Sequence, residues 1–190
     1  MKTPLRYQIT EFDCGTVSLT NCISYLFEIE DIPAELIKNI SVYTLDCYDE
    51  KGNLGQGGTS RQAVEFLSQW IEKYCKLHNF GIDCKYLSKE DVKIEPIKKC
   101  VKNGGCVNLR TYLGSEHYVM ITDIDDEYVY IFDPYYIEKH SSSEVEIINN
   151  YPTKYNRKVK IERFLRDNRR VDFALGPIEK RECVLFTKEK

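Results

Sequence analysis

The chain has 190 residues, of which 27 are lysine or arginine and 30 are aspartate or glutamate, giving a formal net charge of −3. Because the two signs are interspersed, the sequence shows no basic surface of the kind that binds nucleic acid or an anionic membrane. It contains no run of about 18 apolar residues and no signal-peptide pattern near its start, which argues against a membrane span and against export. We therefore expect a cytoplasmic protein, with no membrane segment of its own, formed as a single domain over residues 1–190.

The eight cysteines are too few for a disulfide scaffold in a chain of this length, and without an export signal we expect them to be free thiols. The nearest approach to a metal cluster is Cys75, His78 and Cys84, with Cys100 and Cys106 further along. No paired CxxC element accompanies them, and a buried free cysteine behaves as a small apolar residue. We expect neither a metal nor a cofactor.

Up to about residue 80 the pattern is helical. Apolar residues recur at helical spacing from Cys14 to Phe27, with Asp13 placed to cap the helix, and a short helix is expected at 33–40. The stretch 53–60, "NLGQGGTS", reads as a loop. Thr59 or Ser60 then caps the longest helix, whose apolar face includes Phe66 and which ends before Gly81.

After Gly81 the apolar residues alternate as in strands. We expect strands near 82–86, 106–112, 116–124, 127–133 and 181–188, with a short helix at 96–102. The three central runs follow one another closely and predict an antiparallel meander, with a turn at 124–127. The polar section 138–170 is ambiguous, with a strand near 145–148 and a helix near 161–166. A helical part (about 1–80) and a sheet part (about 81–190) predict an α+β fold.

Cys14 stands at the start of the first predicted helix, in "QITEFDCGTVSL". The positive end of the helix dipole and the free N–H groups there favour a thiolate over a thiol, as a reactive cysteine requires. Burial as a small apolar residue explains the same position equally well. A partner residue must therefore decide between the two interpretations.

Of the three histidines, His117 is the candidate general base. His78 ends the long helix, where a cation is favourable, and His140 lies in "EKHSSS", which reads as a solvated loop. His117 instead begins "HYVMITDI" at a strand end, where a side chain can face a cleft. If the following hairpin has a short loop centred on Asp125, Asp133 lies opposite His117, and a two-residue loop shifts this pairing by one.

Asp133 is an isolated carboxylate at the end of "YVYIFDP". It can simply begin a turn with Pro134, but beside His117 it can also orient the imidazole and stabilise the imidazolium. Cys14, His117 and Asp133 would then supply nucleophile, base and orienting group. Gln8, six residues before Cys14, can donate its side-chain amide to a developing oxyanion, together with the backbone N–H of Cys14.

At these residues the sequence resembles the double-glycine cysteine peptidase family, the papain-like peptidase domains found on bacteriocin exporters. The resemblance lies in Gln8 with "DCG" at 13–15 and the following "VSL", in "GGTS" before a helix, and in "HYVMITDI" with "YVYIFDP". It covers roughly residues 5–136, with a last strand at 181–188. It implies a papain-like fold, in which Cys14 is the nucleophile, His117 the base, Asp133 the orienting residue and Gln8 the oxyanion donor.

Family members typically cut a leader peptide after Gly-Gly, so the resemblance implies a peptide or acyl substrate. The sequence departs from the family in lacking an attached exporter and in its longer polar section at 137–180, which leaves the substrate open. An acyltransferase would use the same residues and differ only in the acceptor of the acyl group. A non-catalytic peptide-binding module has no chemical need for all four residues.

Overall fold

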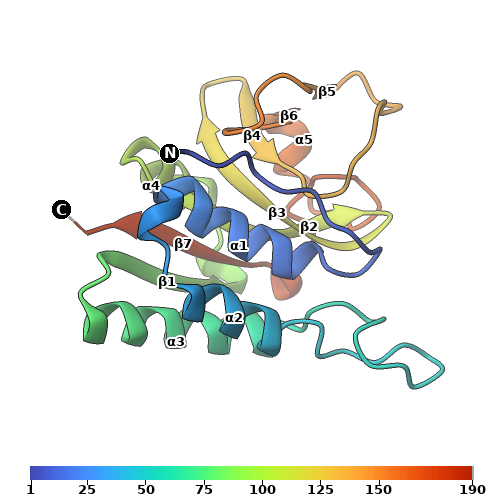
Figure 1. Cartoon of the computed structure of the whole chain (residues 1–190). Helices are drawn as coiled ribbons and strands as arrows, with labels where there is room; N and C mark the ends of the chain where they lie inside the picture. Colours follow the sequence, from blue (N-terminus) through green and yellow to red (C-terminus); the bar gives the residue numbers. More distant parts are fainter. Residues whose placement is uncertain (190) are drawn as a thin grey trace.

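The computed structural model describes residues 1–189, in which helices and a single antiparallel sheet alternate in three layers (Figure 1). The helices are α1 (Cys14–Leu26), α2 (Ala34–Tyr43), α3 (Arg61–His78), α4 (Ile94–Lys102) and α5 (Ile161–Phe164). Short 3-10 turns lie at Ile29–Asp31, Lys89–Asp91 and Ile178–Lys180. Within this described part, no helix is both long enough and apolar enough to cross a bilayer.

All the strands follow residue 81. They are β1 (Ile82–Ser88), β2 (Cys106–Leu113), β3 (Ser115–Ile124), β4 (Tyr128–Phe132), β5 (Val145–Ile147), β6 (Arg157–Lys160) and β7 (Glu182–Lys188). They pair in the order β1-β7-β2-β3-β4-β6-β5, and every neighbouring pair is antiparallel. The predicted meander is therefore confirmed as β2-β3-β4, with the last strand inserted between β1 and β2.

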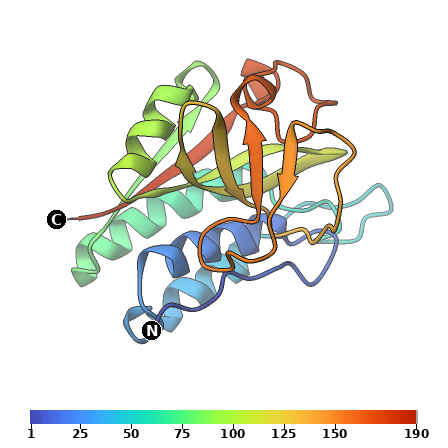
Figure 2. The same cartoon turned by 90° about the horizontal axis from the view of Figure 1, so that it is seen from above.

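The two faces of the sheet bury two separate cores. One face packs against α1, α2 and α3 through Leu19, Ile40 and Leu67, and the other packs against α4 and α5 through Ile97 and Phe164. Seen from above, α4 and α5 lie on one side of the sheet and the three amino-terminal helices lie on the other (Figure 2). Alternation along the central strands, which sends successive side chains to opposite faces, fills both cores.

Several local expectations need correction. The side chain of Asp13 makes no capping hydrogen bond to α1. β6 was not predicted, and α5 ends at Phe164 rather than near residue 166. Phe66 is 45% exposed and packs beside Tyr43 instead of filling the core. The expected cap of α3 is confirmed, since the hydroxyl of Ser60 accepts a hydrogen bond from the backbone N–H of Ala63 at 3.0 Å.

Candidate active site

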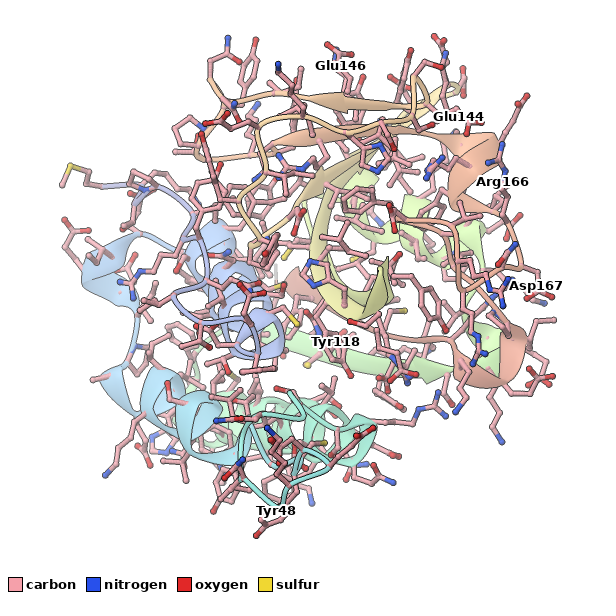
Figure 3. The ribbon with its side chains drawn as sticks, turned by 90° about the vertical axis from the view of Figure 1, so that its right-hand side faces the viewer. Tyr48, Tyr118, Glu144, Glu146, Arg166 and Asp167 are labelled. Atoms are coloured by element: carbon pink, nitrogen blue, oxygen red, sulfur yellow. The ribbon has the colours of Figure 1, made fainter. Side chains whose placement is uncertain are left out.

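One end of the molecule brings together three segments that are far apart in sequence. The segment before α1, the tip of the β2–β3 hairpin and the loop at 44–60 all lie at the right-hand end in Figure 1. Figure 3 looks onto this end, with Tyr118 of β3 near its centre and Tyr48 of the loop at its lower edge. A pocket of about 210 Å³ opens here, lined by Glu11, Cys14, Leu113, Ser115, Glu116, His117 and Tyr135.

Cys14 is the first residue of α1 and is 8% exposed. The first backbone N–H groups of a helix have no partner within the helix and form the positive end of its dipole. The thiol of Cys14 therefore lies at the positive end of α1. The preceding turn is fixed by the carboxylate of Asp13, which accepts hydrogen bonds from the backbone N–H of Ile9 (3.1 Å) and of Thr10 (2.9 Å). Asp13 therefore holds the loop that leads to the thiol rather than capping the helix.

Gly15 allows the 44–60 loop to pack directly on the start of α1. A Cβ atom at Gly15 would lie 2.7 Å from the Oγ1 atom and 2.8 Å from the Cβ atom of Thr59. The same Thr59 hydroxyl accepts a hydrogen bond from the backbone N–H of Leu45 at 3.2 Å, which closes the base of the loop. The "GGTS" stretch thus lies against the helix that carries Cys14.

His117 and Asp133 are in direct contact, since His117 Nε2 lies 2.7 Å from Asp133 Oδ1. The predicted register that led to this pair is wrong. Met120 pairs with Phe132, and the pairing shifts between Ile121 and Asp123, so that at the observed offset Asp133 is not directly opposite His117. The contact forms because Asp133 follows the end of β4 and reaches the imidazole along the strand.

Asp133 is completely buried and is held from several directions. Its backbone N–H donates to Asn156 Oδ1 at 2.7 Å, and its carboxylate accepts from the backbone N–H of Tyr135 at 2.9 Å. The guanidinium of Arg157 approaches the other carboxylate oxygen at 3.4 Å, an ion-pair distance without hydrogen-bond geometry. Arg157, itself fully buried, supplies a positive charge behind the carboxylate.

Neither Asn156 nor Arg157 was identified from the sequence. Arg157 begins β6 and Asn156 directly precedes it, within the polar section 138–170 whose pattern is ambiguous. A buried arginine must be paired, and its partner Asp133, which follows the end of β4, comes close to it only in the folded chain. Burial lowers the pKa of Arg157, while the charge of Asp133 opposes this change.

The environment of His117 favours the imidazolium. Burial lowers its pKa, but the hydrogen bond and charge of Asp133, and then those of Cys14, outweigh this and raise it to about 10. The ring of Tyr135 stands perpendicular to the imidazole, with 6.5 Å between the ring centroids. Cys14 and His117 therefore share one pocket and act on each other electrostatically.

The amide of Gln8 is engaged within its own loop. Its Nε2 donates to the carbonyl oxygen of Thr10 at 2.7 Å, while its Oε1 is buried without a hydrogen-bond partner. The backbone N–H of Gln8 donates to the carbonyl of Pro134 at 2.9 Å, which ties this segment to the residue after Asp133. Gln8 thus lies beside the site but does not present its amide to the pocket.

The other two histidines lie elsewhere. His78 is exposed at the end of α3 and packs on Tyr74. His140 is not solvated as expected: its side chain is 6% exposed and its Nε2 lies 3.2 Å from Asp172 Oδ2. Its other ring nitrogen accepts from the backbone N–H of Ser142, so the imidazole is used to hold a loop.

All eight cysteines are free, and only Cys47 is partly exposed. Cys75 on α3 and Cys84 on β1 lie in the same core, and burial raises the pKa of Cys75 to about 11. Within residues 1–189, no three His, Cys, Asp or Glu side chains are grouped so that they could hold a metal ion.

Comparison with solved structures identifies the fold. A structure described as a C39-like peptidase from Bacillus anthracis superposes with a TM-score of 0.53 at 18% sequence identity, covering 98% of this chain and 96% of the other. The chain has a papain-like α+β fold. A double-glycine motif protease from an AMS/PCAT transporter, crystallised with the leader peptide, gives a TM-score of 0.47 at 17% identity, over 98% of this chain and 92% of that one.

No protein-family model and no curated protein matches the chain in sequence. The resemblance seen in the sequence therefore holds at the level of the fold, which is shared with a C39-like peptidase.

Proposed function

We propose that the protein is a cytoplasmic cysteine peptidase, or a closely related thiol hydrolase, in which Cys14, His117 and Asp133 carry the reaction. The observation that supports this most is the 2.7 Å contact between His117 and a fully buried Asp133, beside a pocket that His117 lines together with Cys14, the first residue of α1. A buried carboxylate that holds an imidazole beside a thiol is the arrangement by which enzymes activate a cysteine.

The proposed reaction begins when the sulfur of Cys14 attacks the carbonyl carbon of a peptide or amide bond. The imidazolium of His117 then gives its proton to the leaving amine, and the acyl group stays on sulfur as a thioester. Neutral His117 next takes a proton from water, whose oxygen attacks the thioester and releases the acid and the Cys14 thiolate. Asp133 keeps the imidazole oriented through both steps and stabilises its charged form.

Gln8 and the backbone N–H of Cys14 are the proposed donors to the oxyanion. For this role the Gln8 amide must leave the carbonyl of Thr10, or use its second N–H, because one proton is engaged there in the structure. An oxyanion donor is typically worth about two to three powers of ten in kcat. The sequence elements that resemble the double-glycine family make a leader peptide the first substrate to test.

Alkylation of Cys14 by iodoacetamide tests the proposal without a substrate. The Cys47→Ser variant is used throughout, because Cys47 is the one cysteine that is partly exposed and would otherwise react as well. We expect Cys14 to react near neutral pH about tenfold faster than a free thiol, and His117→Ala to remove most of this advantage. A Cys14 that reacts like a free thiol and is indifferent to His117 contradicts the proposal.

A trapped acyl-enzyme separates hydrolase from acyltransferase. The acyl-Cys14 species formed with candidate leader peptides is identified by mass, and its decay is compared with and without added amines. We expect water to release the acyl group. Decay that requires an amine assigns the protein to the acyltransferases instead.

A further inference from the structure

The pocket that holds Cys14 and His117 has two carboxylates in its walls. Glu11 stands on the amino-terminal side, three residues before the thiol, and Glu116 stands on β3, directly before His117. Apart from His117, none of the residues lining this pocket carries a positive charge. A substrate that reaches the thiol therefore passes between two acidic side chains.

Glu11 is held toward the pocket although it is exposed. Its carboxylate accepts a hydrogen bond from the hydroxyl of Tyr135 at 3.3 Å, and the Tyr135 ring stands edge-on to the imidazole of His117. The charge of Glu11 is the first cause that raises the pKa of Tyr135. No lysine or arginine of residues 1–189 forms an ion pair with Glu11, so its charge is open to a ligand.

Glu116 forms an ion pair with Arg110, which is more deeply buried than Glu116 itself. Its side chain is 56% exposed, whereas that of its partner Arg110 is only 9% exposed. The Arg110 guanidinium also lies 3.6 Å from a carboxylate oxygen of Glu182, which is fully buried and has Arg61 at 3.3 Å on its other oxygen. Two buried or half-buried arginines thus balance two carboxylates, and the only member of this group that faces the pocket is the negative Glu116.

The charge of Glu116 also reaches the 44–60 loop, which lies at the same end of the molecule (Figure 1). The pKa of Cys47 on that loop is raised by burial, then by Asp46, and then by the charge of Glu116. Glu116 and Asp46 therefore act on Cys47 with the same sign.

From these walls we infer that the substrate carries a cationic group, the side chain of lysine or arginine, next to the bond that Cys14 attacks. The inference rests on the proposed function and narrows it to a substrate class. Glu11 and Glu116 act as specificity-determining residues that attract the positive group as the carbonyl reaches the sulfur. An acidic residue at the same substrate position is disfavoured, because it would meet two like charges.

The test compares two thiol reagents of opposite charge on the whole protein. In the Cys47→Ser variant, Cys14 is modified with the cationic trimethylammonium-ethyl methanethiosulfonate and with the anionic sulfonatoethyl methanethiosulfonate. We expect the ratio of the cationic to the anionic rate to exceed that of free mercaptoethanol by about tenfold, and to fall toward it in high salt. Glu11→Gln and Glu116→Gln should each lower the ratio about threefold.

The matched control is Glu72→Gln, which makes the same change of net charge on the far part of α3 and should leave the ratio unaltered. A ratio equal to that of mercaptoethanol, or one that neither glutamate variant alters, overturns the inference. Neutral iodoacetamide distinguishes a wrong substrate class from a wrong proposed function. If Cys14 still reacts fast with iodoacetamide in a His117-dependent way while the charge ratio equals that of mercaptoethanol, only the substrate class is wrong. If the fast reaction with iodoacetamide is absent, the proposed function and the substrate class are both wrong.

Discussion

The imidazole of His117 contacts the buried carboxylate of Asp133 and lines one pocket with Cys14. Asp133 and Cys14 both favour its charged form, and together they overcome the burial that opposes it. Asn156 holds the backbone of Asp133, while Tyr135 and Arg157 contact its carboxylate, so the carboxylate that meets the imidazole is fixed before any ligand binds. At the scale of the residue, the structure fixes the geometry of the His117–Asp133 pair in the absence of any ligand.

Asp133→Asn tests this role. The amide cannot stabilise an imidazolium as a carboxylate does, so we expect the pKa of His117 to fall from about 10, and alkylation of Cys14 at neutral pH to slow by about tenfold. The His117 titration is followed by NMR and the alkylation by mass spectrometry. Asp83→Asn, an exposed aspartate on β1, is the matched control and should change neither.

The same substitution leaves the buried Arg157 without its counter-charge, which costs about 3–5 kcal/mol in the free energy of unfolding. If Asp133→Asn does not fold, the double variant Asp133→Asn/Arg157→Met removes both buried charges and supplies the folded protein for the measurement. An unchanged His117 pKa in folded protein would show that Asp133 does not control the imidazole.

A site residue can be recognised from the sequence only where the pattern of its neighbours in the chain indicates its position in the fold. Cys14 is marked by the helix pattern that begins with it, and His117 and Asp133 by their places on adjacent strands. The structure brings these three together, while their roles remain predictions. Arg157 carries no such mark, because its burial follows from the pairing of β6 with β4 and not from neighbours in the sequence.

At the scale of the element, α1 and the 44–60 loop are joined where Gly15 meets Thr59. Gly15→Ala places a Cβ atom within 3 Å of two Thr59 side-chain atoms, so we expect a loss of about 1–3 kcal/mol in the free energy of unfolding, despite the better helix propensity of alanine. Urea denaturation measures the loss.

A double-mutant cycle identifies the contact responsible. Thr59→Gly removes both atoms, so the effect of Gly15→Ala should shrink by at least about 1 kcal/mol in that background. Thr59→Ser keeps the Oγ and Cβ atoms and should give no relief. Equal losses in all three backgrounds would mean that the loop does not press on α1 as the structure shows.

Helices and strands could be predicted where the apolar residues follow one clear period. They could not be predicted where the pairing with a neighbouring strand determines the structure. The helical spacing in 61–78 and the alternation in 116–124 define α3 and β3 almost to the residue. β6, "RKVK", offers a single apolar residue and becomes a strand because it pairs on both sides, with β4 and β5. The register of β3 with β4 could not be predicted, because the irregularity at Thr122 has no sequence signal.

At the scale of the whole molecule, the sheet separates two apolar cores, and ionisable groups are buried in and around both. Five buried cysteines, Cys75, Cys84, Cys100, Cys106 and Cys183, have their pKa raised chiefly by burial. In the unfolded chain such thiols lose their protons near pH 9, while the folded protein retains them. Stability therefore falls as the pH rises above about 9.

Between about pH 7 and 8.5 the His117–Asp133 pair is expected to make its own contribution to the pH dependence of stability. The pKa of His117 is raised from 6.5 to about 10, so its stabilising effect is complete below about pH 6.5 and is lost as the pH rises toward 10. We make this prediction for Cys14→Ser, so that no titration of that thiol contributes; Asp133, which raises the His117 pKa more than Cys14 does, is kept in this variant. Between pH 7 and 8.5 the His117 contribution to its free energy of unfolding should fall by up to about 1.4 kcal/mol per pH unit, because the folded state keeps a proton on this imidazole that the unfolded chain loses.

The slope is isolated by comparing Cys14→Ser with Cys14→Ser/His117→Gln in urea titrations at several pH values under reducing conditions. Every other group that titrates in this range, including the amino terminus and the other two histidines, is common to both variants and cancels in the difference. The double variant is expected to be less stable throughout. The decisive quantity is the slope of its free energy of unfolding against pH, which should be less steep by up to about 1.4 kcal/mol per pH unit, the effect of one proton. Equal slopes would mean that His117 titrates alike in the folded and unfolded chains, and that Asp133 does not hold its proton.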